Sequence, residues 1–127
     1  MLENTINHPD VVAEVTRQFA RYEQALTTND TEVLDELFWH SSHTVRLGAG
    51  ENLYGIAEIQ AFRATRPTVN LDRKLRNTVI TTYGEAMAVC STEFTREHTE
   101  KVGRQQQTWV KFAEGWRIVA AHVSLMS

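Results

Sequence analysis

Residues 38–55 read FWHSSHTVRLGAGENLYG and separate two parts of the chain with different hydrophobic periods. Arg46 stands between Val45 and Leu47 in what the pattern predicts to be a short strand, and a glycine-containing turn follows it. Strand alternation places the two aliphatic side chains on one face and Arg46 on the other. This arginine points either to solvent or into a pocket, and the rest of the chain decides which.

The part before this stretch is predicted to be helical. Asp10 or Asn7 would cap a first long helix, and Asp30 or Thr31 would cap a second, shorter one. A third helix is expected over residues 56–65, ended by Pro67. The first helix carries an apolar stripe at spacings of three and four, formed by Val12, Val15, Phe19, Tyr22 and Leu26.

The part after it changes to a β pattern. Four β-rich runs are predicted at residues 71–83, 86–98, 104–112 and 116–125, separated by Tyr-Gly-Glu, Thr-Glu-Lys-Val-Gly and Ala-Glu-Gly. This order predicts a single α+β domain over residues 1–127, with three N-terminal helices packed on a strongly curved, mainly antiparallel sheet. Such a sheet around a long helix leaves a conical pocket, which is the nuclear-transport-factor-2-like cone.

Composition excludes several classes of function. The net charge of −3 disfavours nucleic acid and anionic membranes as partners, and no run is long and apolar enough for a membrane helix. We expect a cytoplasmic protein, because there is no signal-peptide pattern and the single cysteine, Cys90, permits no internal disulfide. Cys90 is predicted to be a buried, inert thiol. His40 and His43 lack a third ligand, so we predict no metal site.

Two residues are the main candidates for chemistry. Tyr22 lies on the helical stripe, where it is either a core tyrosine or a phenol on the wall of the pocket. Arg46 is either an ordinary solvated arginine or a guanidinium inside the cone. In the second case its fork matches a carboxylate through two hydrogen bonds, which predicts a carboxylated ligand.

Five further residues are candidates for substrate binding. Arg63 and Arg66 flank the buried face of the third helix, where they either guide an anion or lie in solvent. In the last strand, alternation groups His122 with Trp116 and Ile118, on a face that would line the pocket or be structural, and sets Val119, Val123 and Leu125 on the other. Glu93 and Gln107 are polar residues in middle strands with the same ambiguity.

The sequence also resembles a known family. The segments FWH…TVR.GAGENLYG and GRQ.QTWV closely resemble the AtzH-like family, whose members accompany amidohydrolases in cyanuric-acid and oxalurate catabolism. The resemblance covers almost the whole chain. It implies a small amide hydrolase that converts 1,3-dicarboxyurea to allophanate, without cofactor or metal, in which Tyr22 and Arg46 form the catalytic pair. Arg46 would hold a substrate carboxylate, and Tyr22 would hydrogen-bond or protonate the reacting amide.

Other functions remain open from the sequence. The chain is alternatively a non-catalytic accessory or ligand-binding protein of the oxalurate pathway, with a pathway amidohydrolase as partner. A ketosteroid-type isomerase would need a carboxylate base with a raised pKa, for which Glu93 is the candidate. We expect a homodimer, because Val119, Val123 and Leu125 are predicted to make the convex face of the sheet apolar.

Overall fold

The computed structural model describes residues 3–127. A short 3-10 helix, Glu3–Thr5, precedes the long helix α1 (Pro9–Thr28) and the short helix α2 (Thr31–Leu37). Two short strands, β1 (Val45–Leu47) and β2 (Asn52–Tyr54), lead to α3 (Ile56–Thr65). Four long strands complete the chain: β3 (Lys74–Tyr83), β4 (Met87–Arg96), β5 (Thr99–Phe112) and β6 (Gly115–Met126).

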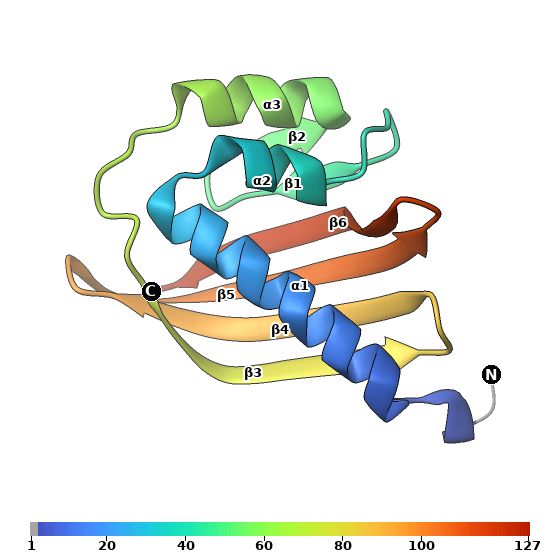
Figure 1. Cartoon of the computed structure of the whole chain (residues 1–127). Coiled ribbons are helices and arrows are strands. Elements are labelled where there is room, and N and C mark those ends of the chain that lie inside the picture. The colour runs from blue at the N-terminus through green and yellow to red at the C-terminus, as the bar shows by residue number, and fades with distance from the viewer. Residues whose placement is uncertain (1–2) are drawn as a thin grey trace.

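The strands form one sheet in the order β2-β1-β6-β5-β4-β3. Neighbouring strands are antiparallel except for β1 and β6, which run parallel, with Arg46 opposite Ala121. Figure 1 shows α1 lying across one face of the long strands, while α2 and α3 lie over the β1–β2 side. The parallel pair therefore attaches the segment that carries Arg46 to the edge of the long hairpins.

Burial of the α1 stripe joins the helices to the sheet. Val15, Phe19 and Tyr22 of α1 are buried, as the predicted period requires. They share one core with Phe38, which follows α2, and with Trp109 of β5. Tyr22 thus lies inside the molecule, close to the end of α1.

The α+β order predicted from the sequence is confirmed, including the bounds of α3. Asp30 caps α2, because its side chain accepts a hydrogen bond of 3.2 Å from the Val33 amide. The predicted caps of α1 are wrong. His8 precedes the helix without a side-chain cap, and the Asn7 side chain instead accepts a hydrogen bond from the Thr82 amide of β3.

The predicted turn at residues 99–103 is also wrong. The β4–β5 hairpin turns at Glu97 and His98, and β5 continues through Gly103. Gly103 pairs with Phe94 across the two strands, and a Cβ at this position would overlap the Phe94 ring. The glycine is therefore explained by close packing inside the sheet and not by a turn.

A β-bulge corrects the predicted faces of β6. Thr108 pairs with Ala120 and the next residue, Trp109, pairs with Ile118, so Val119 is left without a partner. This extra residue reverses the alternation beyond it. Trp116 and Ile118 are inward, and His122 beyond the bulge is exposed. Val123 borders a pocket on the inner face, and Leu125 shares that face, so neither lies on the convex face as predicted.

Within residues 3–127, no helix has the length and apolarity needed to cross a membrane.

Replacing Gly103 by alanine tests the packing of the hairpin. We expect Gly103→Ala to lower the free energy of unfolding by about 1–3 kcal/mol, because the new methyl group forces the Phe94 ring to move. Urea denaturation measures the change. Gly50→Ala is the matched control, since a Cβ at Gly50 meets no atom within 4 Å; equal stability of the two variants would contradict the packing.

Candidate functional site

A cavity of about 440 Å³ lies between the end of α1, the β1–β2 turn, α3 and the far ends of the long strands. It is bordered by apolar side chains together with several arginines and one tyrosine. The lining residues with which chemistry can be associated are Tyr22, Arg46, Glu51, Arg66, Arg73, Arg96, His98 and Gln105. A narrow recess behind it adds Arg63, which borders the same space as Tyr22, Arg46 and Arg66.

Tyr22 reaches this cavity from the buried stripe of α1. Its side chain is 3% exposed, and its ring packs at 60° to Phe38, with 6.3 Å between the centroids. No residue of the described chain hydrogen-bonds its hydroxyl, which is unusual for a buried tyrosine. The phenol is therefore free to interact with a ligand.

Arg46 enters the cavity from β1. Its Nη1 donates a hydrogen bond of 2.8 Å to Oε1 of Glu51, which belongs to the β1–β2 turn. The guanidinium also lies over the Phe62 ring of α3, at 5.6 Å from the centroid. A Cβ at Gly48 would overlap the Glu51 carboxylate, so the Gly48-Ala-Gly segment makes room for this ion pair.

Arg63 and Arg66 bring two further cations from α3 and its end. Nη1 of Arg63 and Nε of Arg66 are buried without a hydrogen-bond partner in the described chain. Burial lowers the pKa of both guanidinium groups, and Arg46 lowers it further as a like charge, whereas an ionised Tyr22 would raise it. An anion placed among these groups would relieve both the desolvation and the repulsion.

Arg73 closes the cavity on the side of β3. Its side chain is 2% exposed and donates two hydrogen bonds to the Glu23 carboxylate, from Nε at 2.8 Å and from Nη2 at 2.7 Å. Nη2 also donates to Gln105 at 3.0 Å. Arg73 and Arg96 both lie over the Phe94 ring, at 4.4 Å and 4.9 Å from its centroid. The Arg73–Glu23 pair ties the segment before β3 to α1.

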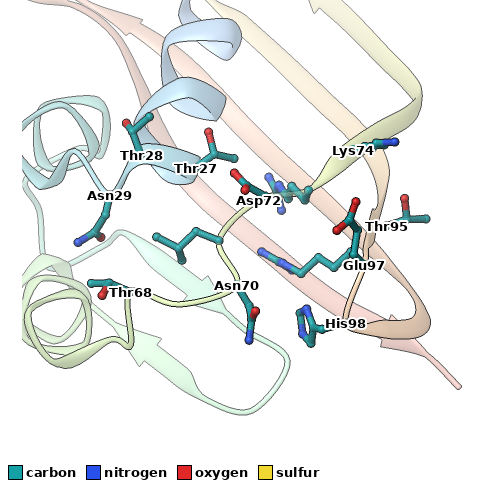
Figure 2. A pocket seen from close by; sticks show the side chains of 13 residues that line it. Thr27, Thr28, Asn29, Thr68, Asn70, Asp72, Lys74, Thr95, Glu97 and His98 are labelled. Carbon is teal, nitrogen blue, oxygen red and sulfur yellow. The ribbon is translucent and has the colours of Figure 1, made fainter.

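A larger hollow of about 980 Å³ adjoins this cavity but contains neither Tyr22 nor Arg46. Figure 2 shows it between Thr27, Thr28 and Asn29 at the end of α1 and the side chains of Thr95, Glu97 and His98. The two spaces share Asn70, Leu71, Arg73, Arg96 and His98. We assign the candidate site to the smaller space, because the buried, unpaired donors are there.

The structure does not place every predicted residue at this cavity. Tyr22, Arg46, Arg63 and Arg66 come together, whereas Glu93 and His122 border a separate depression on the opposite face of the sheet. The prediction that these two line the pocket is wrong for His122 because of the bulge at Val119.

Glu93 faces outward because of strand alternation around the inward Thr92 and Phe94. It accepts hydrogen bonds from Asn77 at 2.9 Å and from Arg76 at 3.0 Å, and these bonds lower its pKa. An isomerase base would need a raised pKa in an apolar pocket, so the prediction of Glu93 as such a base is wrong.

Gln107 faces inward but does not border the cavity. It is 1% exposed, and its Oε1 accepts a hydrogen bond of 3.1 Å from Nε1 of Trp109, while its Nε2 is buried without a partner. Cys90, opposite Gln107 on β4, is fully buried, and burial raises its pKa to about 12. The prediction of a buried thiol is confirmed. Within the described residues no cluster of His, Cys, Asp and Glu fits a metal ion.

Five of the cavity residues named above were missed in the sequence: Glu51, Arg73, Arg96, His98 and Gln105. Sequence spacing cannot predict that Glu51 pairs with Arg46 or that Arg73 pairs with Glu23. Arg73 and Glu23 lie 50 positions apart. Only the resemblance in GAGENLYG gave a hint of Glu51, and it gave none of its partner.

The fold, three α-helices packed on one six-stranded sheet, defines the class of protein. Structures of nuclear-transport-factor-2-like proteins share this arrangement, among them one from Salmonella enterica serovar Typhimurium with 26% identity, a TM-score of 0.74 and coverage of 93% of this chain and 92% of that one. The AtzH-like family model matches residues 4–127. The chain belongs to the AtzH-like family.

Two solved structures are much more similar. A protein of unknown function of the DUF3225 family from Pectobacterium atrosepticum shares 70% identity, with a TM-score of 0.99 over 100% of this chain and 99% of that one. A cystatin-like fold protein from Burkholderia xenovorans shares 48% identity, with a TM-score of 0.93 and 96% coverage of each chain. No curated protein matches the chain significantly.

Removing Glu23 tests the ion pair that holds the cavity wall. We expect Glu23→Ala to lower the free energy of unfolding by about 3 kcal/mol, because Arg73 would remain buried without a counter-charge. Chemical denaturation at neutral pH measures this loss.

Glu36→Ala is the control for that measurement. It removes the exposed Arg21–Glu36 pair, whose side chains are 42% and 47% exposed, and should cost less than about 1 kcal/mol. A loss for Glu23→Ala no larger than for Glu36→Ala would show that the Arg73–Glu23 pair does not stabilise the fold.

Proposed function

We propose that this protein is a small amide hydrolase that acts on an N-carboxylated urea and converts 1,3-dicarboxyurea to allophanate. One observation carries the proposal: Arg46 and Arg66 line one cavity with Tyr22, Arg63 joins them in the narrow recess behind it, and buried N–H groups of Arg63 and Arg66 have no partner in the described chain. Cations arranged in this way favour a ligand with more than one negative charge. Membership of the AtzH-like family supports the same substrate.

In this proposal the two carboxylates of the substrate bind to different arginines. The guanidinium of Arg46 binds one of them, and Arg63 and Arg66 bind the other from α3. The partly buried surroundings strengthen each contact, because little water competes for the donors. The urea is thereby held across the cavity with its amide groups near the Tyr22 ring.

Tyr22 then acts on the bond that breaks. A carboxyl group is lost from one urea nitrogen, either by attack of water on the carboxyl carbon, which gives bicarbonate, or by direct release of carbon dioxide. In both cases the electron pair of the C–N bond goes to the nitrogen, which needs a proton. The free Tyr22 hydroxyl donates that proton and recovers one from solvent, and allophanate leaves with one carboxylate fewer.

The same charges imply that the product, allophanate, binds more weakly than the substrate. Allophanate keeps only one carboxylate, so it cannot engage both Arg46 and the α3 arginines as the substrate does. Loss of one charged contact lowers its affinity and favours release. A homodimer stays a prediction, and its packing basis now excludes Val123, which borders the cavity, and Leu125, which shares its face of β6 beyond the bulge.

Turnover by the purified protein tests the proposal. With 1,3-dicarboxyurea generated in situ by an upstream amidohydrolase, we expect wild type to accelerate allophanate release over the spontaneous rate. Tyr22→Phe and Arg46→Ala should each lower the catalysed rate by at least about 100-fold, because they remove the proton donor and a substrate contact.

Tyr54→Phe and Arg104→Ala are the controls for that assay. Tyr54 is 60% exposed, and Arg104 lies on the outer face, so both variants should retain the wild-type rate. No acceleration by wild type would reject the hydrolase and leave an accessory or ligand-binding role in the oxalurate pathway as the leading function.

A further inference from the structure

Glu51 is the one carboxylate among the described residues that border the cavity. It lies on Arg46, the residue to which we assign a substrate carboxylate, with 2.8 Å between Oε1 and Nη1. The two side chains are 25% and 16% exposed, so the pair is largely protected from solvent. The Glu51 carboxylate and a carboxylate of the ligand would therefore compete for the Arg46 guanidinium.

The β1–β2 turn holds Glu51 in this position. The Gly50 amide donates a hydrogen bond of 3.2 Å to Oε2 of Glu51, and the Gly48 amide donates one of 2.8 Å to its backbone carbonyl. The space that a side chain at Gly48 would fill is taken by the Glu51 carboxylate. The contact with Arg46 is thus built into the turn and is more than a chance surface pair.

The other two cations differ from Arg46 in this respect. Arg63 and Arg66 form no ion pair in the described chain. Within the described residues, the guanidinium of Arg66 donates only to the Asn29 side chain, at 2.9 Å, and that of Arg63 lies over the Phe38 ring, at 5.1 Å from the centroid. One end of the cavity is neutralised by the protein itself, and the other end is not.

We propose that Glu51 is an internal competitor that occupies Arg46 until a carboxylate of the ligand displaces it. The inference rests on the proposed binding of a carboxylated ligand at Arg46. A ligand with one carboxylate gains little there, because it exchanges one carboxylate partner of Arg46 for another. A ligand with two carboxylates also engages Arg63 and Arg66, and these contacts offset the cost of displacing Glu51.

Calorimetric titration with glutarate tests this role without any turnover. Glutarate has the same chain length between its carboxylates as 1,3-dicarboxyurea and carries no bond to hydrolyse. We expect Glu51→Gln to raise the affinity for glutarate about tenfold, because a neutral amide competes poorly for the guanidinium. Wild type should bind butyrate, which lacks one carboxylate, at least about tenfold more weakly than glutarate.

Two comparisons isolate the contact with Arg46. Glu85→Gln removes the same charge in the β3–β4 turn, at the opposite end of those strands from Arg96, and should leave the affinity within about twofold. In the Arg46→Ala background, adding Glu51→Gln should also change the affinity by less than about twofold. Glu51→Ala provides a second variant if the glutamine variant fails to fold by circular dichroism.

Several results would overturn the inference. An affinity that falls in Glu51→Gln would mean that Glu51 positions Arg46 instead of competing with the ligand. An equal gain in the Arg46→Ala background would show that the effect comes from overall charge and not from competition for Arg46. Equal binding of butyrate and glutarate by wild type would show that the second carboxylate of glutarate makes no favourable contact. If wild type binds glutarate but Glu51→Gln gains nothing, the inference fails while the proposed carboxylate site stands.

The experiments also distinguish a competitor role for Glu51 in a protein that does not hydrolyse 1,3-dicarboxyurea. A tenfold gain in Glu51→Gln together with no hydrolysis of 1,3-dicarboxyurea by wild type would support the competitor and reject the hydrolase. Failure of every variant to bind glutarate would reject both the carboxylate site and the competitor.

Discussion

The main constraint on this structure is that several guanidinium groups lie beside one another in a partly buried space. Arg46, Arg63 and Arg66 border the same recess, and burial and mutual repulsion lower the pKa of the two from α3. A fold without a use for these charges would replace them by apolar side chains at little cost. The cluster is therefore best explained by a ligand that supplies negative charge.

The fold neutralises only part of this charge, and it does so at the edges of the cavity. Glu23 pairs with the buried Arg73 through two hydrogen bonds and joins α1 to the segment before β3. Glu51 pairs with Arg46 from the β1–β2 turn. The first pair is structural and is shielded by Phe94 and Gln105, whereas the second faces the space in which a ligand would bind. An arginine–carboxylate pair thus stabilises the fold in one place and competes with the ligand in the other.

The sequence predicted the elements and the faces of Tyr22 and Arg46 because these depend on local pattern, whereas the pairing of the two residues came from the resemblance to the AtzH-like family. The helical stripe placed Tyr22 inside, and alternation around Val45 separated Arg46 from its aliphatic neighbours. The faces of β6 could not be predicted, since a single unpaired residue, Val119, reverses the alternation and leaves no mark on composition. The partners of the cavity arginines could not be predicted either. Glu51 is brought to Arg46 by a turn, and the sequence spacing does not determine the geometry of that turn.

The position of a bound dianion tests the central claim most directly. A crystal structure of the protein with glutarate should show one carboxylate on Arg46, with Glu51 moved away, and the other among Arg63 and Arg66 beneath the Tyr22 hydroxyl. Such a complex would establish the cavity as a receptor for dicarboxylates of the size of 1,3-dicarboxyurea. Glutarate bound only on exposed basic side chains, with the Arg46–Glu51 pair intact and the cavity arginines untouched, would contradict the account.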